Sequence, residues 1–184
     1  MITLLSRFIL FTIMRWKIVG NFPKGVKKYV LIGAPHTSNY DFIIGLLIKG
    51  VLKEPINFIG KKSLFKFPFG VFFKSVGGVP VDRKKNQKTV DAIAKIYEER
   101  EQFIFAISPE GTRSKVDTWK TGFYYLAKKA NVPIVALTFD FGKRQTEIFE
   151  PFYPTDNVEK DFDYLMSLYE GIEGKNKENS FFKS

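Results

Sequence analysis

The sequence contains no cysteine and a single histidine, His36, among its 184 residues. The lack of cysteine excludes disulfide bonds, thiolate nucleophiles and cysteine metal ligands. With only one imidazole as well, a zinc site built by the protein is not expected, and we predict no bound metal. Any catalysis must therefore use hydroxyls, carboxylates, cations and His36, the one side chain whose unperturbed pKa lies near neutrality.

Acidic residues are missing from the start of the chain, where Asp41 is the first. The residues before it include six basic ones, namely Arg7, Arg15, Lys17, Lys24, Lys27 and Lys28. The whole chain has 29 basic and 19 acidic residues, a formal net charge of +10. This balance favours an anionic partner, and composition alone does not choose between nucleic acid, anionic lipid headgroups and acidic proteins.

Long hydrophobic runs are also absent. The most apolar segment, "LLSRFILFTIMRW" at residues 4–16, is interrupted by Arg7 and Arg15, and it falls short of the roughly 20 apolar residues that span a bilayer. It lacks the basic start and the cleavage site of a signal peptide. We predict that residues 1–15 form a short amphipathic helix lying in a membrane interface. The alternative is a helix that packs its apolar face on its own domain.

The order of apolar segments predicts the fold. Four apolar, partly β-branched runs read as buried strands at 28–34, 56–61, 103–108 and 132–141, and shorter strands are expected at 16–22, within "GGVPVDR" at 77–83, and at 144–150. Helical spacing is found at 41–53, 88–101, 121–131 and 158–172, with short helical turns at 63–76. This alternation predicts an α/β fold with a mixed, largely parallel central sheet flanked by helices. We expect one domain over 16–172, with its core at 30–140, and a frayed polar tail at 173–184.

The segment "PHTSNYD" places His36 five residues before Asp41, at the turn between a predicted strand and a predicted helix. A carboxylate that accepts from one imidazole nitrogen leaves the other nitrogen free to act as a base. The alternative is that Asp41 only caps the helix.

Two further segments carry cations and turn-forming residues. "SPEGTRS" follows the strand at 103–108, so Gly111 allows a tight turn and Arg113 offers a guanidinium suited to phosphate, with Thr112 as a hydroxyl donor. "GGVPVDR" ends in Arg83, which would add a second guanidinium. Each segment alone is better explained as a solvated turn or charged face than as a binding site.

Four sequence blocks taken together are far more specific than any one of them alone. His36-x4-Asp41, Gly77-x5-Arg83, Glu110-Gly-Thr-Arg113 and "VPI" at 132–134, in this order, resemble the 1-acyl-glycerol-3-phosphate acyltransferase family, also called the glycerolipid or lysophospholipid acyltransferases. The resemblance covers residues 16–140 and includes "KSLFKFPFG" at 62–70. It implies the glycerolipid acyltransferase fold.

The resemblance also implies a reaction. His36 would deprotonate the acceptor hydroxyl and Asp41 would orient His36. The hydroxyl would then attack the thioester of an acyl-carrier-protein or coenzyme A donor, without an acyl-enzyme intermediate and without a bound cofactor. Arg83 and the block Glu110, Gly111, Thr112 and Arg113 would bind the phosphate or polar head of a lysophospholipid acceptor.

Family members sit on membranes, so the resemblance implies a peripheral protein at the cytoplasmic face of the cell membrane, with anionic lipid and acyl carrier protein as partners and no nucleic acid. The acceptor stays open, because a lyso-aminolipid would present a similar hydroxyl. A non-enzymatic basic module that binds lipid or RNA would not need His36, Asp41 and the Glu110 block together. A lipid hydrolase is disfavoured because no G-x-S-x-G element is present.

Overall fold

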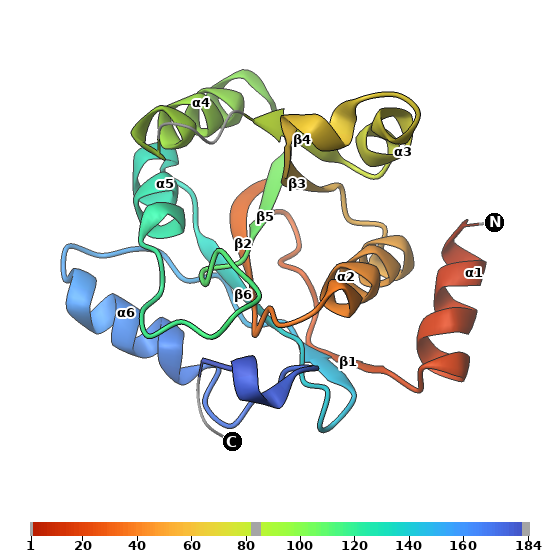
Figure 1. Cartoon of the computed structure of the whole chain (residues 1–184). Helices are drawn as coiled ribbons and strands as arrows, with labels where there is room; N and C mark the ends of the chain where they lie inside the picture. Colours follow the sequence, from red (N-terminus) through yellow and green to blue (C-terminus); the bar gives the residue numbers. More distant parts are fainter. Residues whose placement is uncertain (1, 82–85, 182–184) are drawn as a thin grey trace.

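The computed structural model describes residues 2–81 and 86–181 and is built around a five-stranded sheet (Figure 1). The strand order is β4 (Gly78–Val81), β3 (Ile56–Lys61), β5 (Phe103–Ile107), β2 (Lys28–Ala34) and β6 (Ile134–Thr138). Every pair of neighbouring strands in this sheet is parallel. The predicted α/β sheet is confirmed. The segment carrying His36 leaves the carboxyl end of β2, which lies between β5 and β6.

Helices cover both faces of the sheet because the side chains of β2 alternate in direction. Val30 and Ile32 belong to one core cluster, which α4 (Asn86–Glu99), α5 (Gly122–Ala130) and α6 (Val158–Ser167) cover. Tyr29 and Leu31 belong to a second cluster on the opposite face, which includes buried residues of α2 (Asn39–Leu52). Figure 1 shows α5 and α6 on the left of the sheet and α2 on the right.

A separate two-stranded parallel sheet joins the N-terminal part of the chain to a late segment. It pairs β1 (Lys17–Val19) with β7 (Gln145–Glu147). Trp16, just before β1, is buried and donates from Nε1 to Thr146 Oγ1 at 3.0 Å. The remaining short elements are η2 (Lys62–Phe65), α3 (Phe69–Ser75) and η3 (Lys177–Asn179).

The N-terminal segment is helical, as predicted. It consists of α1 (Ile2–Arg7) and a π-helical continuation, η1 (Phe8–Ile13). Leu10 and Ser6 are buried, and Leu10 belongs to the core cluster that includes α2. Most of the large apolar side chains point away from the domain, namely Leu4, Leu5, Phe8, Phe11 and Ile13. Within residues 2–81 and 86–181, no helix has the length and apolar character needed to cross a membrane.

The end of the chain differs from the frayed tail that its polar composition predicts. Residues 173–181 fold back on the domain, where the Gly174 N–H donates to Ser180 Oγ at 3.0 Å. The ring of Phe181 lies 5.8 Å from the ring of Trp119, centroid to centroid. Hydrogen bonds hold the segment on the domain as well, because the Phe141 N–H donates to the Glu173 carbonyl at 2.8 Å and Asn176 reaches the loop that carries His36.

Candidate active site

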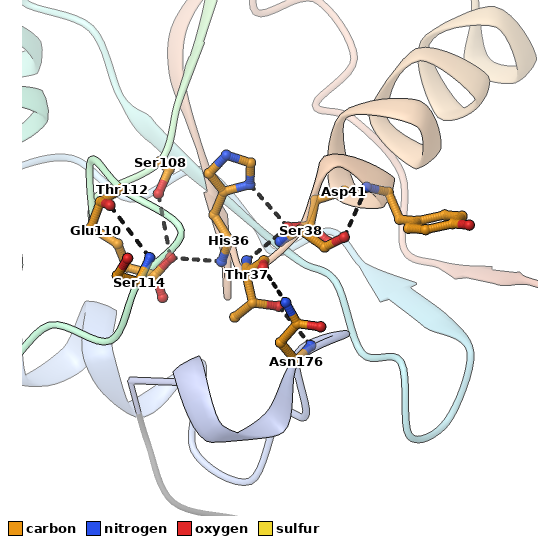
Figure 2. Close-up of polar contacts among 10 residues, drawn as sticks. His36, Thr37, Ser38, Asp41, Ser108, Glu110, Thr112, Ser114 and Asn176 are labelled. Atoms are coloured by element: carbon orange, nitrogen blue, oxygen red, sulfur yellow. Dashed lines mark hydrogen bonds and ion pairs between the residues drawn. The ribbon is translucent and has the colours of Figure 1, made fainter.

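His36 and Asp41 meet at the turn between β2 and α2 (Figure 2). His36 Nδ1 lies 3.0 Å from Asp41 Oδ2. The Asp41 side chain is 1% exposed, whereas that of His36 is 26% exposed. The pair is therefore buried on its carboxylate side and open on its imidazole side.

Asp41 also caps helix α2, so both interpretations of its spacing hold at once. Its Oδ2 accepts hydrogen bonds from the Thr37 N–H at 2.8 Å and the Ser38 N–H at 2.9 Å. Ser38 is the N-cap residue, and its Oγ accepts from the Tyr40 N–H at 3.2 Å in a capping box completed by Asp41. The capping bonds fix the carboxylate that contacts the imidazole.

This geometry leaves one imidazole nitrogen available for chemistry. When His36 Nδ1–H donates to Asp41, the lone pair of Nε2 is free to accept a proton. Figure 2 shows the imidazole ring directed away from the helix, with only Nδ1 turned towards Asp41. The arrangement can act as a general base on a hydroxyl that reaches the exposed side of the ring.

Glu110 lies on the other side of His36. Its Oε2 accepts a hydrogen bond from the His36 backbone N–H at 2.6 Å, and Ser108 Oγ lies 3.5 Å from the same oxygen. Glu110 is 2% exposed. Burial raises the pKa of this carboxyl above its usual value, the hydrogen bond from His36 opposes the shift, and the charge of Asp41 adds to it.

A small cavity of about 10 Å³ adjoins Glu110, lined also by Pro35 and Trp119. Glu110 Oε1 and Trp119 Nε1 are buried without a hydrogen-bond partner among the described residues. The buried position explains the direction of the Glu110 pKa shift. The Glu110 carboxyl faces the protein interior, whereas a side chain that binds a ligand from solvent is exposed.

The other residues of the predicted anion-binding block are exposed. Gly111 has φ +66°, a conformation that favours glycine, and it turns the chain directly after Glu110. Thr112 Oγ1 accepts from the Ser114 N–H at 3.4 Å. Arg113 is exposed at the same turn. A Cβ at Gly111 would lie 3.0 Å from Lys120 Nζ, so Lys120 adds a cation to this loop that the sequence motifs did not indicate.

Asn176 is a second residue that the sequence motifs missed. Its backbone N–H donates to Thr37 Oγ1 at 3.1 Å, and its Nδ2 donates to the Thr37 carbonyl at 3.0 Å. Thr37 directly follows His36 and is buried. The last described segment thus holds the loop that carries His36. Nothing in the local pattern around Asn176 signals this contact, because its partner is 139 positions away in the sequence.

The structure brings together His36, Asp41 and Glu110, and it places Gly111, Thr112 and Arg113 on the loop that continues from Glu110. The predicted second guanidinium, Arg83, lies outside the described residues. Among the described residues, no group of three or more His, Asp or Glu side chains is placed to hold a metal ion.

Comparison with known proteins places this geometry in a family. The family sequence model described as "Acyltransferase" matches residues 15–140, which is more than half of the chain. The chain belongs to the acyltransferase family. The resemblance drawn from the four sequence blocks is confirmed, and the match includes His36, Asp41 and the Glu110 block.

One curated relative of this acyltransferase is the 1-acyl-sn-glycerol-3-phosphate acyltransferase BAT2, chloroplastic, of Brassica napus. The two are 29% identical over 109 residues, which is 56% of this chain and 31% of the relative. The chain therefore matches about a third of the length of that relative. Among solved structures, PlsC from Thermotoga maritima, a 1-acyl-sn-glycerophosphate (LPA) acyltransferase, matches with a TM-score of 0.62 and 20% identity. That match covers 91% of this chain and 74% of PlsC, and it shows a shared fold.

Proposed function

We propose that this acyltransferase moves a fatty acyl group from a thioester donor to the hydroxyl of a lysophospholipid-type acceptor, with His36 as general base. The observation that carries the proposal is the contact of 3.0 Å between His36 Nδ1 and Asp41 Oδ2, with the imidazole partly exposed. The family match and the names of the two similar proteins support a glycerophosphate lipid as the acceptor.

The reaction follows from the free nitrogen of His36. As the acceptor oxygen attacks the thioester carbonyl, its proton passes to Nε2, and the Asp41 carboxylate stabilises the imidazolium that forms. The tetrahedral intermediate then collapses, the carbon–sulfur bond breaks and the thiolate receives the proton from His36. The products are an ester and a free thiol, and the enzyme returns to its starting state.

The acceptor's anionic head would be bound by the exposed turn after Glu110. Arg113 presents a planar guanidinium suited to phosphate, and Thr112 adds a hydroxyl donor. Lys120 lies beside Gly111 in the same loop and adds positive charge. Arg83 is proposed as a further cation of this site. Glu110 is assigned a different task within the site, namely to hold the backbone of His36.

The donor is proposed to be acyl-carrier protein or coenzyme A thioester, and the place of action the cytoplasmic face of the cell membrane. The formal charge of +10 suits an acidic carrier, an anionic lipid surface and a phosphate-bearing acceptor.

Acyl transfer by wild-type protein and by His36→Ala tests the proposal. Radiolabelled acyl-carrier-protein and acyl-coenzyme A donors are each incubated with a panel of lysophospholipids and lyso-aminolipids, and the acylated product is identified by chromatography. We expect transfer to at least one lysophospholipid, and a loss of about 10²–10⁴-fold in the variant. Transfer at the wild-type rate by folded His36→Ala would disprove the role of His36, and transfer to lyso-aminolipids alone would replace the proposed acceptor.

A further inference from the structure

Helix α3 and the turn before it present apolar side chains to solvent. We use the name α3 tip for residues 66–75. Phe67 is 90% exposed, Val71 is 70% exposed and Phe69 is 68% exposed, and Phe72 is exposed as well. Single exposed apolar residues are ordinary, but four large apolar side chains exposed within the six residues 67–72 indicate an interaction surface.

The exposure of the α3 tip follows from how its inner face is packed. Gly70 is buried against Phe65, whose carbonyl oxygen would lie 2.1 Å from a Cβ at this position. Phe73 is half-buried, and its ring lies 6.1 Å from that of Phe65. At helical spacing, Phe72 lies nearly opposite Gly70, with Phe69 and Val71 on either side of Phe72. The close approach at Gly70 therefore holds the three apolar side chains outward.

The charge around the α3 tip has one sign. Lys66 and Lys74 are exposed at its two ends. No acidic residue occurs between Glu54 and Asp82 in the sequence. Apolar side chains framed by lysines, without acids, match the chemistry of an anionic lipid interface, where rings insert and ammonium groups meet phosphates.

The α3 tip is mechanically linked to the helix that carries Asp41. Lys49 on α2 donates from Nζ to the Val76 carbonyl, directly after α3, at 2.7 Å, and to the Ile56 carbonyl at 2.6 Å. On its other side α2 packs against α1, whose own apolar side chains point outward. Figure 1 shows α1, α2 and α3 together on the right of the view. The exposed Tyr40 and Ile43 lie on α2.

We propose that the α3 tip inserts into the interface of an anionic bilayer as a second anchor, separate from the α1–η1 segment. Two anchors on either side of α2 would fix the orientation of the protein, so that the amino end of α2, with His36, faces the lipid surface. This orientation rests on the proposed function, in which the acceptor is a lipid. A carrier protein fits the α3 tip less well, because an acidic partner would pair with charges rather than with four exposed apolar side chains.

The experiment measures partition of the full chain onto vesicles of phosphatidylcholine and phosphatidylglycerol in equal amounts, without donor or acceptor. We expect Phe69→Ser combined with Val71→Ser to lower the partition coefficient about tenfold or more, since each removes apolar area from the interface. The matched control, Tyr125→Ser combined with Tyr153→Ser, removes exposed rings elsewhere, Tyr125 being on α5 across the sheet, and should bind like wild type.

A fluorescent variant tests insertion directly. Trp16 and Trp119 are buried, so Phe67→Trp adds the exposed indole. Its emission should shift to the blue on these vesicles and be quenched by brominated lipid. An unchanged partition coefficient for Phe69→Ser with Val71→Ser, or a Phe67→Trp emission unaffected by vesicles, would overturn the inference.

Two other occupants of the α3 tip would also overturn it. If Phe69→Ser with Val71→Ser converts a dimer to a monomer in the absence of lipid while partition is unchanged, the tip is an interface between copies of the chain. If it abolishes transfer only from acyl-carrier protein, with unchanged partition, the tip binds the carrier. Because partition is measured without turnover, failure of the acyl-transfer assay would leave this result intact, and the reverse also holds.

Discussion

The Glu110 carboxylate holds the backbone of His36, because its Oε2 accepts the His36 N–H at 2.6 Å while Asp41 holds the ring at Nδ1. One residue is thus fixed by two carboxyl groups, one acting on the main chain and one on the side chain. We therefore propose Glu110 as a positioning residue, since its carboxyl is buried and contacts the backbone of His36.

Glu110→Ala should slow acyl transfer and destabilise the fold. The part-buried His36 N–H would lose its acceptor, at a cost of about 1–3 kcal/mol in the free energy of unfolding. Loosening the base should lower kcat about tenfold or more. Glu110→Gln keeps an oxygen that can accept the same hydrogen bond, so kcat should stay near the wild-type value. Equal losses of kcat in both variants would contradict the positioning role.

The stability of the wild-type protein and that of Glu110→Gln should depend differently on pH. The raised pKa of Glu110 means that, as pH rises past the ordinary value of 4.5, the unfolded chain loses this proton before the folded chain does. The free energy of unfolding then falls with rising pH until the folded carboxyl has also ionised. Glu110→Gln has no such titration, so its Tm should rise relative to wild type over that interval. A difference in Tm that does not change with pH would contradict the raised pKa of Glu110.

Asp41→Asn should separate the two tasks of Asp41. The amide keeps an oxygen for the capping hydrogen bonds but carries no charge to stabilise an imidazolium, so kcat should fall about 10²–10⁴-fold. The matched variant is Ser38→Ala, which removes the capping oxygen that accepts from Tyr40 and should cost about 1 kcal/mol of stability. Its kcat should be unchanged. Comparable losses of kcat in the two variants would reduce Asp41 to a helix cap.

Asn176→Ala should loosen the catalytic loop from a distance. It removes the side-chain hydrogen bond to the Thr37 carbonyl, and we expect a loss of about 1 kcal/mol in stability and a several-fold drop in kcat. Lys177→Ala is the control, because this exposed lysine pairs with Glu173 rather than with the loop that carries His36. Thermal denaturation and initial rates measure both effects. A kcat equal for the two variants would show that the terminal segment is not coupled to turnover.

Gly111→Ala should destabilise the turn that follows Glu110. The backbone there has φ +66°, and a Cβ would meet the Lys120 side chain at 2.9 Å, so we expect a loss of about 1–2 kcal/mol. Gly122→Ala provides the contrast, because it begins α5 and has no atom near a new Cβ. That substitution should leave the Tm unchanged or higher. Similar Tm values for the two variants would contradict the strain argument.

The fold was predictable because its signals are local. The apolar run at 28–34 coincides with β2, since a strand buried on both faces of a parallel sheet needs apolar side chains throughout, and the run at 56–61 coincides with β3. The N-terminal helix was predicted at residues 1–15, and its place in a membrane interface stays a prediction. Its inner stripe, Ser6 and Leu10, is narrow, so the helix both packs on the domain and exposes most of its apolar side chains.

The site was predictable where its partners are close in sequence. His36 and Asp41 are five residues apart, and the turn between them brings them together. The task of Glu110 could not be predicted, because its spacing from Arg113 indicated a ligand-binding turn and gave no sign of the contact with His36 across 74 positions. Asn176 is more distant still, and a polar segment at the end of a chain normally indicates disorder.

The sequence separation of these contacts has a consequence for synthesis. His36 leaves the ribosome early, but its two backbone supports follow 74 positions later at Glu110 and, through Thr37, 139 positions later at Asn176. β2 also cannot form its hydrogen bonds in the sheet before its two neighbours, β5 and β6, have been made. Non-local parallel pairing of this kind is slow. The nascent chain therefore carries His36 in a loop without these supports until Asn176 has been made, while the basic, apolar segment of α1 and η1 has already been made and is available to a lipid surface.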